Sequence, residues 1–335
     1  MRDWWRPDLT LASALLLPAS WLFGLLAAAR RALYRAGLLK IERLPVPVIV
    51  VGNLIVGGSG KTPLVIALAE ALAAKGYRPG VVSRGYGGAS AGTAPREVSA
   101  DADPARTGDE PALIRRRTGC PLFVGADRPA AARALLAAYP QVNVIIADDG
   151  LQHYALGRDF SIAVFDERGT GNGRLLPAGP LREPMSRTGS LDAIVVNGKL
   201  ATTLPVSRLT LRMHLQADAL YRLANPAQRL GVAEFITAHG TRVAAVAGIG
   251  SPARFFATLR SLGLNCEEHP FPDHHAYAHG DLAGLNAPVI VMTEKDAIKC
   301  AAYADLPIWV LPVSAVLDAA LLDAILEKIR GPQTA

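Results

Sequence analysis

A glycine-rich turn between two apolar segments is the part of this chain best suited to chemistry. The sequence VPVIVVGNLIVGGSGKTP begins at Val46 and runs from β-branched residues through Gly57, Gly58 and Gly60 to Lys61. A strand, such a turn and a following helix together direct backbone N–H groups and the positive end of the helix toward one anion. Glycines leave the backbone open to phosphate oxygens. The pattern therefore predicts a binding site for a nucleoside triphosphate.

Two side chains at the end of this turn suit the same ligand. We expect Lys61 to reach the β- and γ-phosphates and the Thr62 hydroxyl to ligate magnesium, as in a Walker A loop. The standard pattern has a glycine where this chain has Ile55, so the loop is a variant. The alternative is an ordinary glycine-rich turn that happens to contain a lysine.

An acidic pair follows a second apolar run. The sequence VIIA leads directly into Asp148 and Asp149, and Gly150 follows them. A carboxylate at the end of a strand beside the phosphate loop can hold magnesium directly or through water, as in a Walker B element. Either aspartate could take this role, and the other could position a water or a substrate hydroxyl. A solvated acidic turn after a core strand is the alternative.

Two further groups of residues are weaker candidates. Asp109, in the sequence GDEP, precedes a helix, where acids are common because they stabilise the helix dipole. His274 lies in the sequence FPDHH, which resembles an exposed turn. An aspartate paired with a histidine can accept the proton of an alcohol during phosphoryl transfer. Spacing alone does not pair these two residues.

Charged residues in two glycine- or proline-rich loops could contact phosphate or substrate. Arg84 opens the sequence RGYGG after a strand, and Arg182 and Glu183 lie in PLREP. Loops at strand ends often carry function, although each of these could equally be ordinary turn chemistry.

Composition limits the class of protein. The chain has 335 residues, of which 50% are hydrophobic and 19% charged, so we expect packed structure, with a length that suits two domains. The net charge of +6 suits a nucleotide, an acidic lipid surface or nucleic acid. No basic stripe interleaved with aromatic residues supports nucleic-acid binding. The three cysteines are widely spaced, so neither a disulfide framework nor a zinc site is predicted.

The amino-terminal region contains 21 uncharged residues from Leu9 to Ala29, with Pro18 in the middle. This is close to the ~20 residues that cross a bilayer as a helix. Arg30 and Arg31 follow it, which places the remaining chain on the cytoplasmic side. We favour a helix that lies in or partly enters the membrane. A spanning helix, a cleaved signal peptide and a buried core helix are the alternatives.

The rest of the chain alternates strand-like and helix-like segments, which predicts a doubly wound, mostly parallel α/β sheet typical of P-loop NTPases. Residues 41–197 form the expected nucleotide-binding domain and residues 1–40 the membrane-associated segment. Residues 198–212 lose the alternation and are expected to link to a smaller α/β domain over residues 213–335. Ligands should gather at the carboxyl ends of the parallel strands.

The motifs taken together resemble one known family. In chain order they read VGNLIVGGSGKTP, SRGYGG, GDEP, DDGLQH, GNGRLLPAGPLREP, AGIGSPARFF, FPDHH and TEKDAIKC. This set is similar to that of the tetraacyldisaccharide 4′-kinases of the lipid A pathway in Gram-negative bacteria. The family's phosphate loop diverges at the position of Ile55, so that residue supports the resemblance. Leu151 stands where the family often has phenylalanine, a conservative change.

The resemblance implies an activity and its site. The family transfers the γ-phosphate of ATP, with magnesium, to the 4′-hydroxyl of a tetraacylated glucosamine disaccharide 1-phosphate at the cytoplasmic face of the inner membrane. It implies that Asp109, paired with His274, accepts the proton of the hydroxyl and that Lys61 is the third catalytic residue. It also implies that Asp148 or Asp149 joins Thr62 as a ligand of magnesium. The implied ATP-binding residues are Ile55, Val56, Gly57, Gly58, Ser59, Gly60, Lys61 and Thr62.

The expected partners are therefore the acylated disaccharide and the membrane surface, with no nucleic acid and a monomeric chain. A different class also combines a variant phosphate loop with a membrane-binding segment. These are the nucleotide-switched partition ATPases, which act through protein partners. Such a switch would hydrolyse ATP slowly and dimerise with nucleotide.

Overall fold

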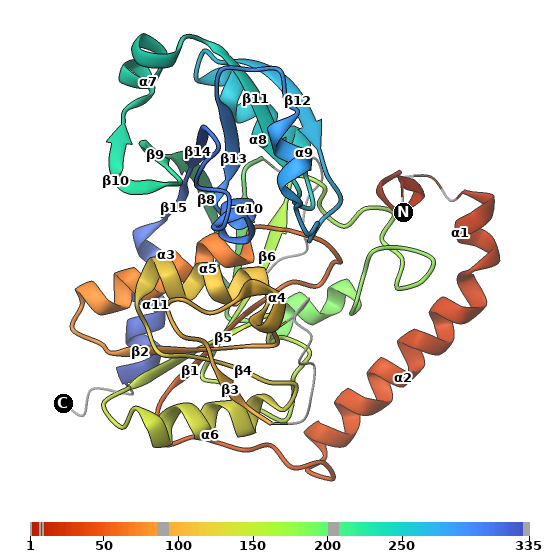
Figure 1. The fold of residues 1–335 in the computed structure, drawn as a ribbon. Coiled ribbons are helices and arrows are strands. Elements are labelled where there is room, and N and C mark those ends of the chain that lie inside the picture. The colour runs from red at the N-terminus through yellow and green to blue at the C-terminus, as the bar shows by residue number, and fades with distance from the viewer. Residues whose placement is uncertain (1, 7, 9, 86–93, 200–207, 331–335) are drawn as a thin grey trace.

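The computed structural model describes residues 2–6, 8, 10–85, 94–199 and 208–330. Tyr86 and the glycines of the SRGYGG motif after Gly85, and most of the expected linker, lie outside these ranges. Two sheets dominate the described chain, and a pair of helices at the amino terminus extends from them (Figure 1).

The larger sheet has nine strands and is parallel except at its two edges. Its strands, in spatial order, are β15 (Val313–Leu317), β8 (Thr210–Ala217), β7 (Ala193–Asn197), β6 (Phe160–Asp166), β1 (Val48–Gly52), β5 (Val144–Asp148), β2 (Pro79–Ser83), β4 (Leu122–Val124) and β3 (Arg96–Glu97). The helices of this domain are α3 (Lys61–Ala74), α4 (Pro104–Thr107), α5 (Asp109–Thr118), α6 (Arg128–Ala138), the 3-10 helix η2 (Met185–Ser190) and α11 (Ala319–Arg330).

Burial explains why the central strands are continuous apolar runs. Every residue of β1, β5 and β6 is buried, because helices or loops cover both faces of the sheet. Helices α3, α5 and α11 contribute to one apolar cluster, and α6 contributes to the cluster on the other face. The predicted doubly wound α/β architecture is therefore confirmed. β1 and β5 are neighbours, so the phosphate loop and the acidic pair leave the same edge of the sheet.

The smaller sheet has six strands, β10 (Asn225–Leu230), β9 (Leu220–Arg222), β14 (Ile308–Leu311), β13 (Ile290–Thr293), β11 (Arg242–Ala247) and β12 (Asn265–Pro270). Its helices are α7 (Val232–His239), α8 (Pro252–Ser261), α9 (His279–Ala283), α10 (Glu294–Ala297) and the 3-10 helix η3 (Ile298–Cys300). Aromatic residues of α7 and α8, including Phe235 and Phe256, fill one face of this sheet.

The strand order moves the expected domain boundary. The sequence assigns residues 213–335 to the smaller domain, but β15 pairs antiparallel with β8 in the larger sheet, and α11 packs against the larger core through Leu321 and Ile325. β8 also begins inside the expected linker 198–212. The smaller domain is thus inserted between β8 and β15, which form a two-stranded connection. The amphipathic pattern of α11 predicts a helix with one buried face, but it does not predict which of the two sheets that face will cover.

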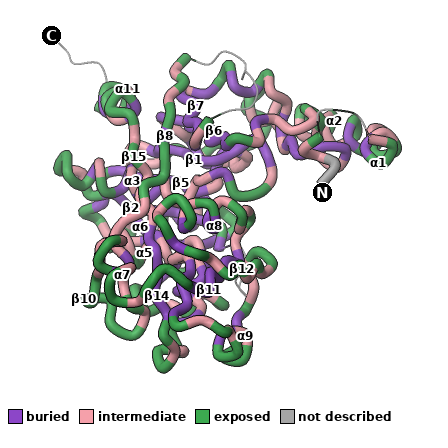
Figure 2. Tube along the Cα trace, turned by 90° about the horizontal axis from the view of Figure 1, so that it is seen from above, coloured by how far each residue is buried: buried purple, intermediate pink, exposed green. Residues whose placement is uncertain are grey.

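The amino-terminal apolar run forms two helices and not one. α1 covers Leu11–Leu15 and α2 covers Leu17–Arg35, with Pro18 in the first turn of α2, where its missing N–H costs nothing. A short 3-10 helix, η1 (Arg2–Trp5), precedes them. Figure 2 shows α1 and α2 projecting away from the two sheets. No helix of the described chain combines the length and apolarity that a bilayer crossing needs.

Side-chain exposure argues against the alternative of a buried core helix. Leu22, Leu25 and Leu26 of α2 are 57%, 67% and 61% exposed, and Trp21 is 68% exposed. The face that contacts the protein is narrow. Ser20 donates to the carbonyl of Leu175 at 2.8 Å, and the chain approaches so closely there that a Cβ on Gly24 would collide with the Leu175 side chain.

Candidate functional site

The phosphate loop has the backbone of an anion cradle. Gly57 and Gly60 adopt φ of 92° and 96°, values that disfavour any residue with a side chain. α3 begins at Lys61 directly after Gly60, and no side chain caps its first N–H groups. A Cβ on Gly58 would meet nothing within 4 Å, so the loop is open at its centre. These groups are therefore available to an anion at the positive end of α3.

Two asparagines hold the loop from behind. Asn53 Nδ2 donates to the carbonyl of Gly57 at 3.1 Å, and Asn197 Nδ2 donates to the carbonyl of Ser59 at 3.3 Å. The buried Ile55 pairs in extended conformation with Leu181. This pairing explains why isoleucine replaces the usual glycine, because the backbone here is a short bridge packed into the core.

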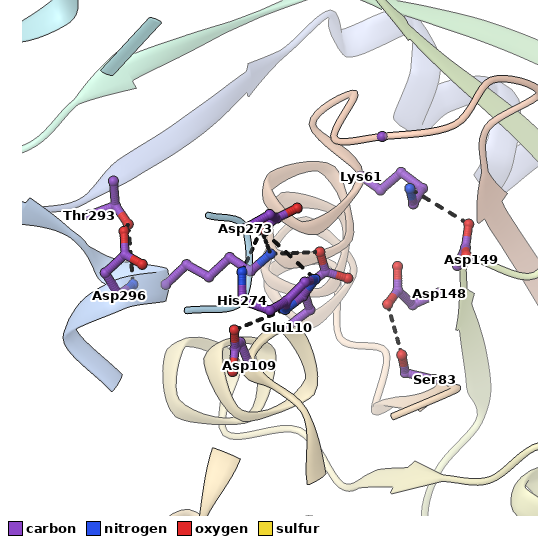
Figure 3. Close-up of polar contacts among 12 residues, drawn as sticks. Lys61, Ser83, Asp109, Glu110, Asp148, Asp149, Asp273, His274, Thr293 and Asp296 are labelled. Carbon is purple, nitrogen blue, oxygen red and sulfur yellow. Dashed lines mark hydrogen bonds and ion pairs between the residues drawn. The ribbon is translucent and has the colours of Figure 1, made fainter. Parts of the chain in front are cut away.

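Lys61 and the acidic pair lie together (Figure 3). Lys61 Nζ is 3.6 Å from Asp149 Oδ1, and Arg182 Nη1 is 3.2 Å from the same carboxylate. Burial opposes ionisation of Asp149, but the charges of Lys61 and Arg182 outweigh it, so the pKa of Asp149 is lowered. Its φ of 48° is unusual for a residue with a side chain. The protein thus holds this carboxylate charged and in a strained position.

Asp148 lies deeper than Asp149. It is 1% exposed and accepts a hydrogen bond from the Ser83 hydroxyl at 2.9 Å (Figure 3). Its second oxygen, Oδ1, is buried without a hydrogen-bond partner among the described residues. Burial raises the pKa of Asp148, and the charges of Glu110 and Asp149 raise it further. A buried carboxylate oxygen without a partner fits a ligand for a hard cation such as Mg²⁺.

Asp109 and His274 meet although they come from different domains. His274 Nδ1 is 3.1 Å from Asp109 Oδ2, across 165 positions of sequence (Figure 3). Asp109 begins α5, and His274 lies in the loop after β12. His274 has a φ of 62°, and it shares a positive φ with Asp149 alone among the described non-glycine residues. Strained backbone at both positions is typical of a functional site.

The two partners shift each other's pKa. Burial opposes ionisation of Asp109, but the hydrogen bond with His274 and the charges of Lys299 and Lys295 outweigh it and lower its pKa. The hydrogen bond to Asp109 raises the pKa of His274, against burial and the charge of Lys295. The pair therefore favours a carboxylate at position 109 that is ready to accept a proton.

Sequence reasoning missed Lys299, a basic residue beside Asp109. Lys299 Nζ lies 3.6 Å from Asp109 Oδ2 and 3.1 Å from Asp296 Oδ1. Asp296 is fully buried and accepts hydrogen bonds from the Gly248 N–H and the Thr293 hydroxyl. The TEKDAIKC motif could have indicated this role, because its two lysines lie four positions apart, the spacing of one helical face, directly after an apolar strand.

A second missed residue contacts the phosphate loop itself. Arg168 donates from Nη2 to the carbonyl of Gly58 at 2.8 Å and pairs with the buried Asp166. Its guanidinium lies 4.3 Å from the centre of the Trp5 ring. Asp166 is also 3.8 Å from Arg254 of the smaller domain. Arg168 thus lies where the amino-terminal segment, the phosphate loop and the smaller domain approach one another.

Of the loop residues that the sequence suggested as phosphate or substrate contacts, one contacts the acidic pair and two do not. Arg182 contacts Asp149, as described, whereas Glu183 faces away and pairs with Arg187 and the Tyr154 hydroxyl. Arg84 is exposed after β2, where its positive charge is among the causes that lower the pKa of Arg128 and of His153. A Cβ added to Gly250 of the smaller domain would lie 3.4 Å from the Gly58 nitrogen. The two domains therefore meet directly over the phosphate loop.

Comparison with known proteins assigns the chain to a family. The sequence profile of the family described as tetraacyldisaccharide-1-P 4′-kinase matches residues 12–330. The chain belongs to this family. A tetraacyldisaccharide 4′-kinase of Dechloromonas aromatica is 53% identical over 321 residues, which cover 96% of this chain and 94% of that protein. One of Alkalilimnicola ehrlichii is 52% identical, covering 90% of this chain and 87% of that protein.

A solved structure extends the comparison to three dimensions. The crystal structure of LpxK from Aquifex aeolicus, described as a complex with ATP, superposes with a TM-score of 0.81 at 31% sequence identity. The match covers 95% of this chain and all of that chain. The structural match therefore covers both sheets and the connection between them.

Proposed function

We propose that this chain transfers the γ-phosphate of ATP to the 4′-hydroxyl of tetraacyldisaccharide 1-phosphate in lipid A biosynthesis. The observation that carries the proposal is the Asp109–His274 pair, which the smaller domain completes beside an open phosphate loop. Family membership supplies the substrate class. The relatives carry the name of this activity, and the related crystal structure is described as an ATP complex.

The residues of the chain divide the chemistry between them. The N–H groups of residues 57–62 and Lys61 hold and neutralise the triphosphate, and Asp109 accepts the proton of the sugar hydroxyl. The hydroxyl oxygen forms a bond to the γ-phosphorus while the bond from that phosphorus to the β,γ-bridging oxygen breaks, so ADP leaves. His274 orients Asp109 and stabilises its charge until the proton arrives.

Asp148 and Thr62 are the residues that would hold Mg²⁺, with Asp149 beside them. The unpartnered Oδ1 of Asp148 supports this assignment. When bound, the cation neutralises charge on the β- and γ-phosphates. Asp149 keeps Lys61 directed toward the same place through their 3.6 Å ion pair.

Membrane attachment through α2 is part of the proposal. The exposed leucines Leu22, Leu25 and Leu26 form an apolar surface on a helix that projects from the protein (Figure 1). A helix of this kind lies in the interface and buries its apolar face among acyl chains. An acylated substrate would reach the site from the same surface. We place the protein at the cytoplasmic face of the inner membrane, where ATP is present.

A labelling assay tests the proposed function. Detergent-solubilised protein is incubated with ATP labelled in its γ-phosphate, magnesium and the disaccharide 1-phosphate, and lipid is then extracted. We expect label on the lipid, and none when the lipid acceptor lacks a free 4′-hydroxyl. ATP hydrolysis without labelled lipid would contradict the proposal and favour a nucleotide switch.

A further inference from the structure

A cleft between the end of α2 and the larger domain carries an unusual concentration of arginine. Its volume is about 260 Å³, and five arginines line it. Arg31 and Arg35 come from α2 and Arg43 from the stretch between α2 and β1, whereas Arg158 and Arg187 come from later parts of the larger domain. The cleft therefore brings together basic groups that are far apart in sequence.

The positive charge of the cleft is largely uncompensated. Arg31, Arg35 and Arg43 form no ion pair with any residue in the described part of the chain. Arg158 donates to backbone carbonyls, and Arg187 is paired with the single carboxylate of Glu183. Burial lowers the pKa of Arg158 to about 10, and repulsion by Arg187 adds to this effect. Arginine side chains carry positive charge at neutral pH, so a cleft lined by five of them suits an anion.

Aromatic rings close one side of the cleft. Tyr34 of α2 and Tyr154 of the larger domain lie with ring centres 5.7 Å apart. Arg30 lies over both rings and donates to the carbonyl of Gln152 at 3.2 Å. These contacts fix the end of α2 against the protein, so the arginines of both segments face a defined space.

The position of the cleft indicates the source of the anion. Arg31 and Arg35 follow the exposed Leu25 and Leu26 by one to three helical turns on the same helix. If α2 lies in the interface, these arginines lie at the depth of lipid headgroups. The phosphate loop is a separate anion site, formed at the start of α3.

We propose that this cleft binds the phosphate headgroup of an anionic lipid of the bilayer. The inference rests on the membrane attachment proposed above and adds a specific headgroup site to it. Guanidinium groups bind phosphate through paired N–H···O bonds, and arginine is the side chain best shaped for this contact. The exposed leucines supply attachment to any bilayer, whereas the cleft adds a preference for anionic ones.

Vesicle binding tests the proposal with two double variants of equal charge. Arg35→Gln/Arg43→Gln changes the cleft, and Arg6→Gln/Lys40→Gln removes two positive charges that flank the apolar segment outside it. Each protein is titrated with vesicles of phosphatidylcholine alone and of phosphatidylcholine mixed with phosphatidylglycerol. We expect the cleft variant to bind the mixed vesicles roughly tenfold less tightly than the control variant. Equal losses in both variants would overturn the proposal.

Further measurements separate the possible sources of phosphate. Inorganic phosphate at millimolar concentration should not displace the protein from mixed vesicles, and displacement would overturn the assignment to a lipid headgroup. In neutral detergent the cleft variant should keep the wild-type KM for the disaccharide. A tenfold higher KM there would assign the cleft to the substrate and overturn the inference while leaving the proposed kinase intact. An inactive wild type with normal vesicle preference would instead contradict the kinase alone.

Discussion

The two halves of the candidate site are assembled in different ways. Lys61 follows the loop after β1, and Asp148 and Asp149 lie at the end of the neighbouring β5, so the fold of the larger domain positions all three. Asp109 meets its histidine only where the smaller domain packs against α5. The difference teaches that phosphate binding can be built locally, whereas the proton acceptor depends on how two domains meet.

The contacts that hold the second half are charged and partly buried. Arg117 pairs with Glu294 at 2.6 Å, and Lys295 lies 3.4 Å from Glu110 and 3.1 Å from Asp273. The first half is held by hydrogen bonds to backbone carbonyls of the loop.

The largest expected effect comes from removing the proton acceptor. Asp109→Ala should lower kcat by roughly 10²–10⁴-fold, because the sugar hydroxyl loses its general base. ATP affinity should change little, since the polar contacts of the Asp109 side chain are with His274 and Lys299 and not with the phosphate loop in the described part of the chain. Turnover and ATP affinity are measured on the purified variant, with circular dichroism as the control for folding. Near-normal turnover would refute the role assigned to Asp109.

Lys61→Ala, unlike Asp109→Ala, should weaken ATP binding. The variant loses the charge that neutralises the triphosphate, and of the two ion pairs of Asp149 described above it keeps the one with Arg182. We expect a fall in kcat of roughly 10²–10³-fold together with weaker ATP binding. Lys61→Arg serves as the matched variant that keeps the charge. Unchanged ATP affinity in Lys61→Ala would break the proposed division between the two halves.

This division also governs how much could be predicted from sequence. The phosphate loop, the acidic pair and the order of strands and helices follow from local patterns, because each motif is continuous and ends a buried strand. The pairing of Asp109 with His274 came only from family resemblance. Residues 165 positions apart carry no local signal of contact. The fold brings them together through an inserted domain.

The errors have the same physical origin. The return of β15 and α11 to the larger sheet could not be read from an apolar pattern that would suit either sheet. The roles of Lys299 and Arg168 were missed because their partners, Asp109 and Gly58, lie far away in sequence. The break at Leu16 was missed because the apolar run continues through it, although Pro18 marked the position.

Lys299→Met tests whether the charges around Asp109 tune it. The variant removes a cation 3.6 Å from the carboxylate, so the pKa of Asp109 should rise and the acid limb of the pH–rate profile should move to higher pH. We expect roughly a tenfold loss of kcat/KM near the acid end of the profile, where one pKa unit corresponds to a tenfold change in ionisation. Lys299→Arg should restore the limb. An unshifted limb in Lys299→Met would assign Lys299 to packing alone.

The smallest effect concerns stability and pH. The pKa of His274 is raised, so its ion pair with Asp109 stabilises the folded chain fully below the ordinary histidine pKa and loses this contribution as the pH rises through the shifted value. His274→Gln should therefore lower Tm at pH 6 and have less effect at pH 8.5. The expected difference is below about 1 kcal/mol, because the pair is partly solvated. His275→Gln, which removes a histidine bound to Asp281 of its own domain, is the matched control. A Tm difference between wild type and His274→Gln that grows with pH would contradict the charged pair.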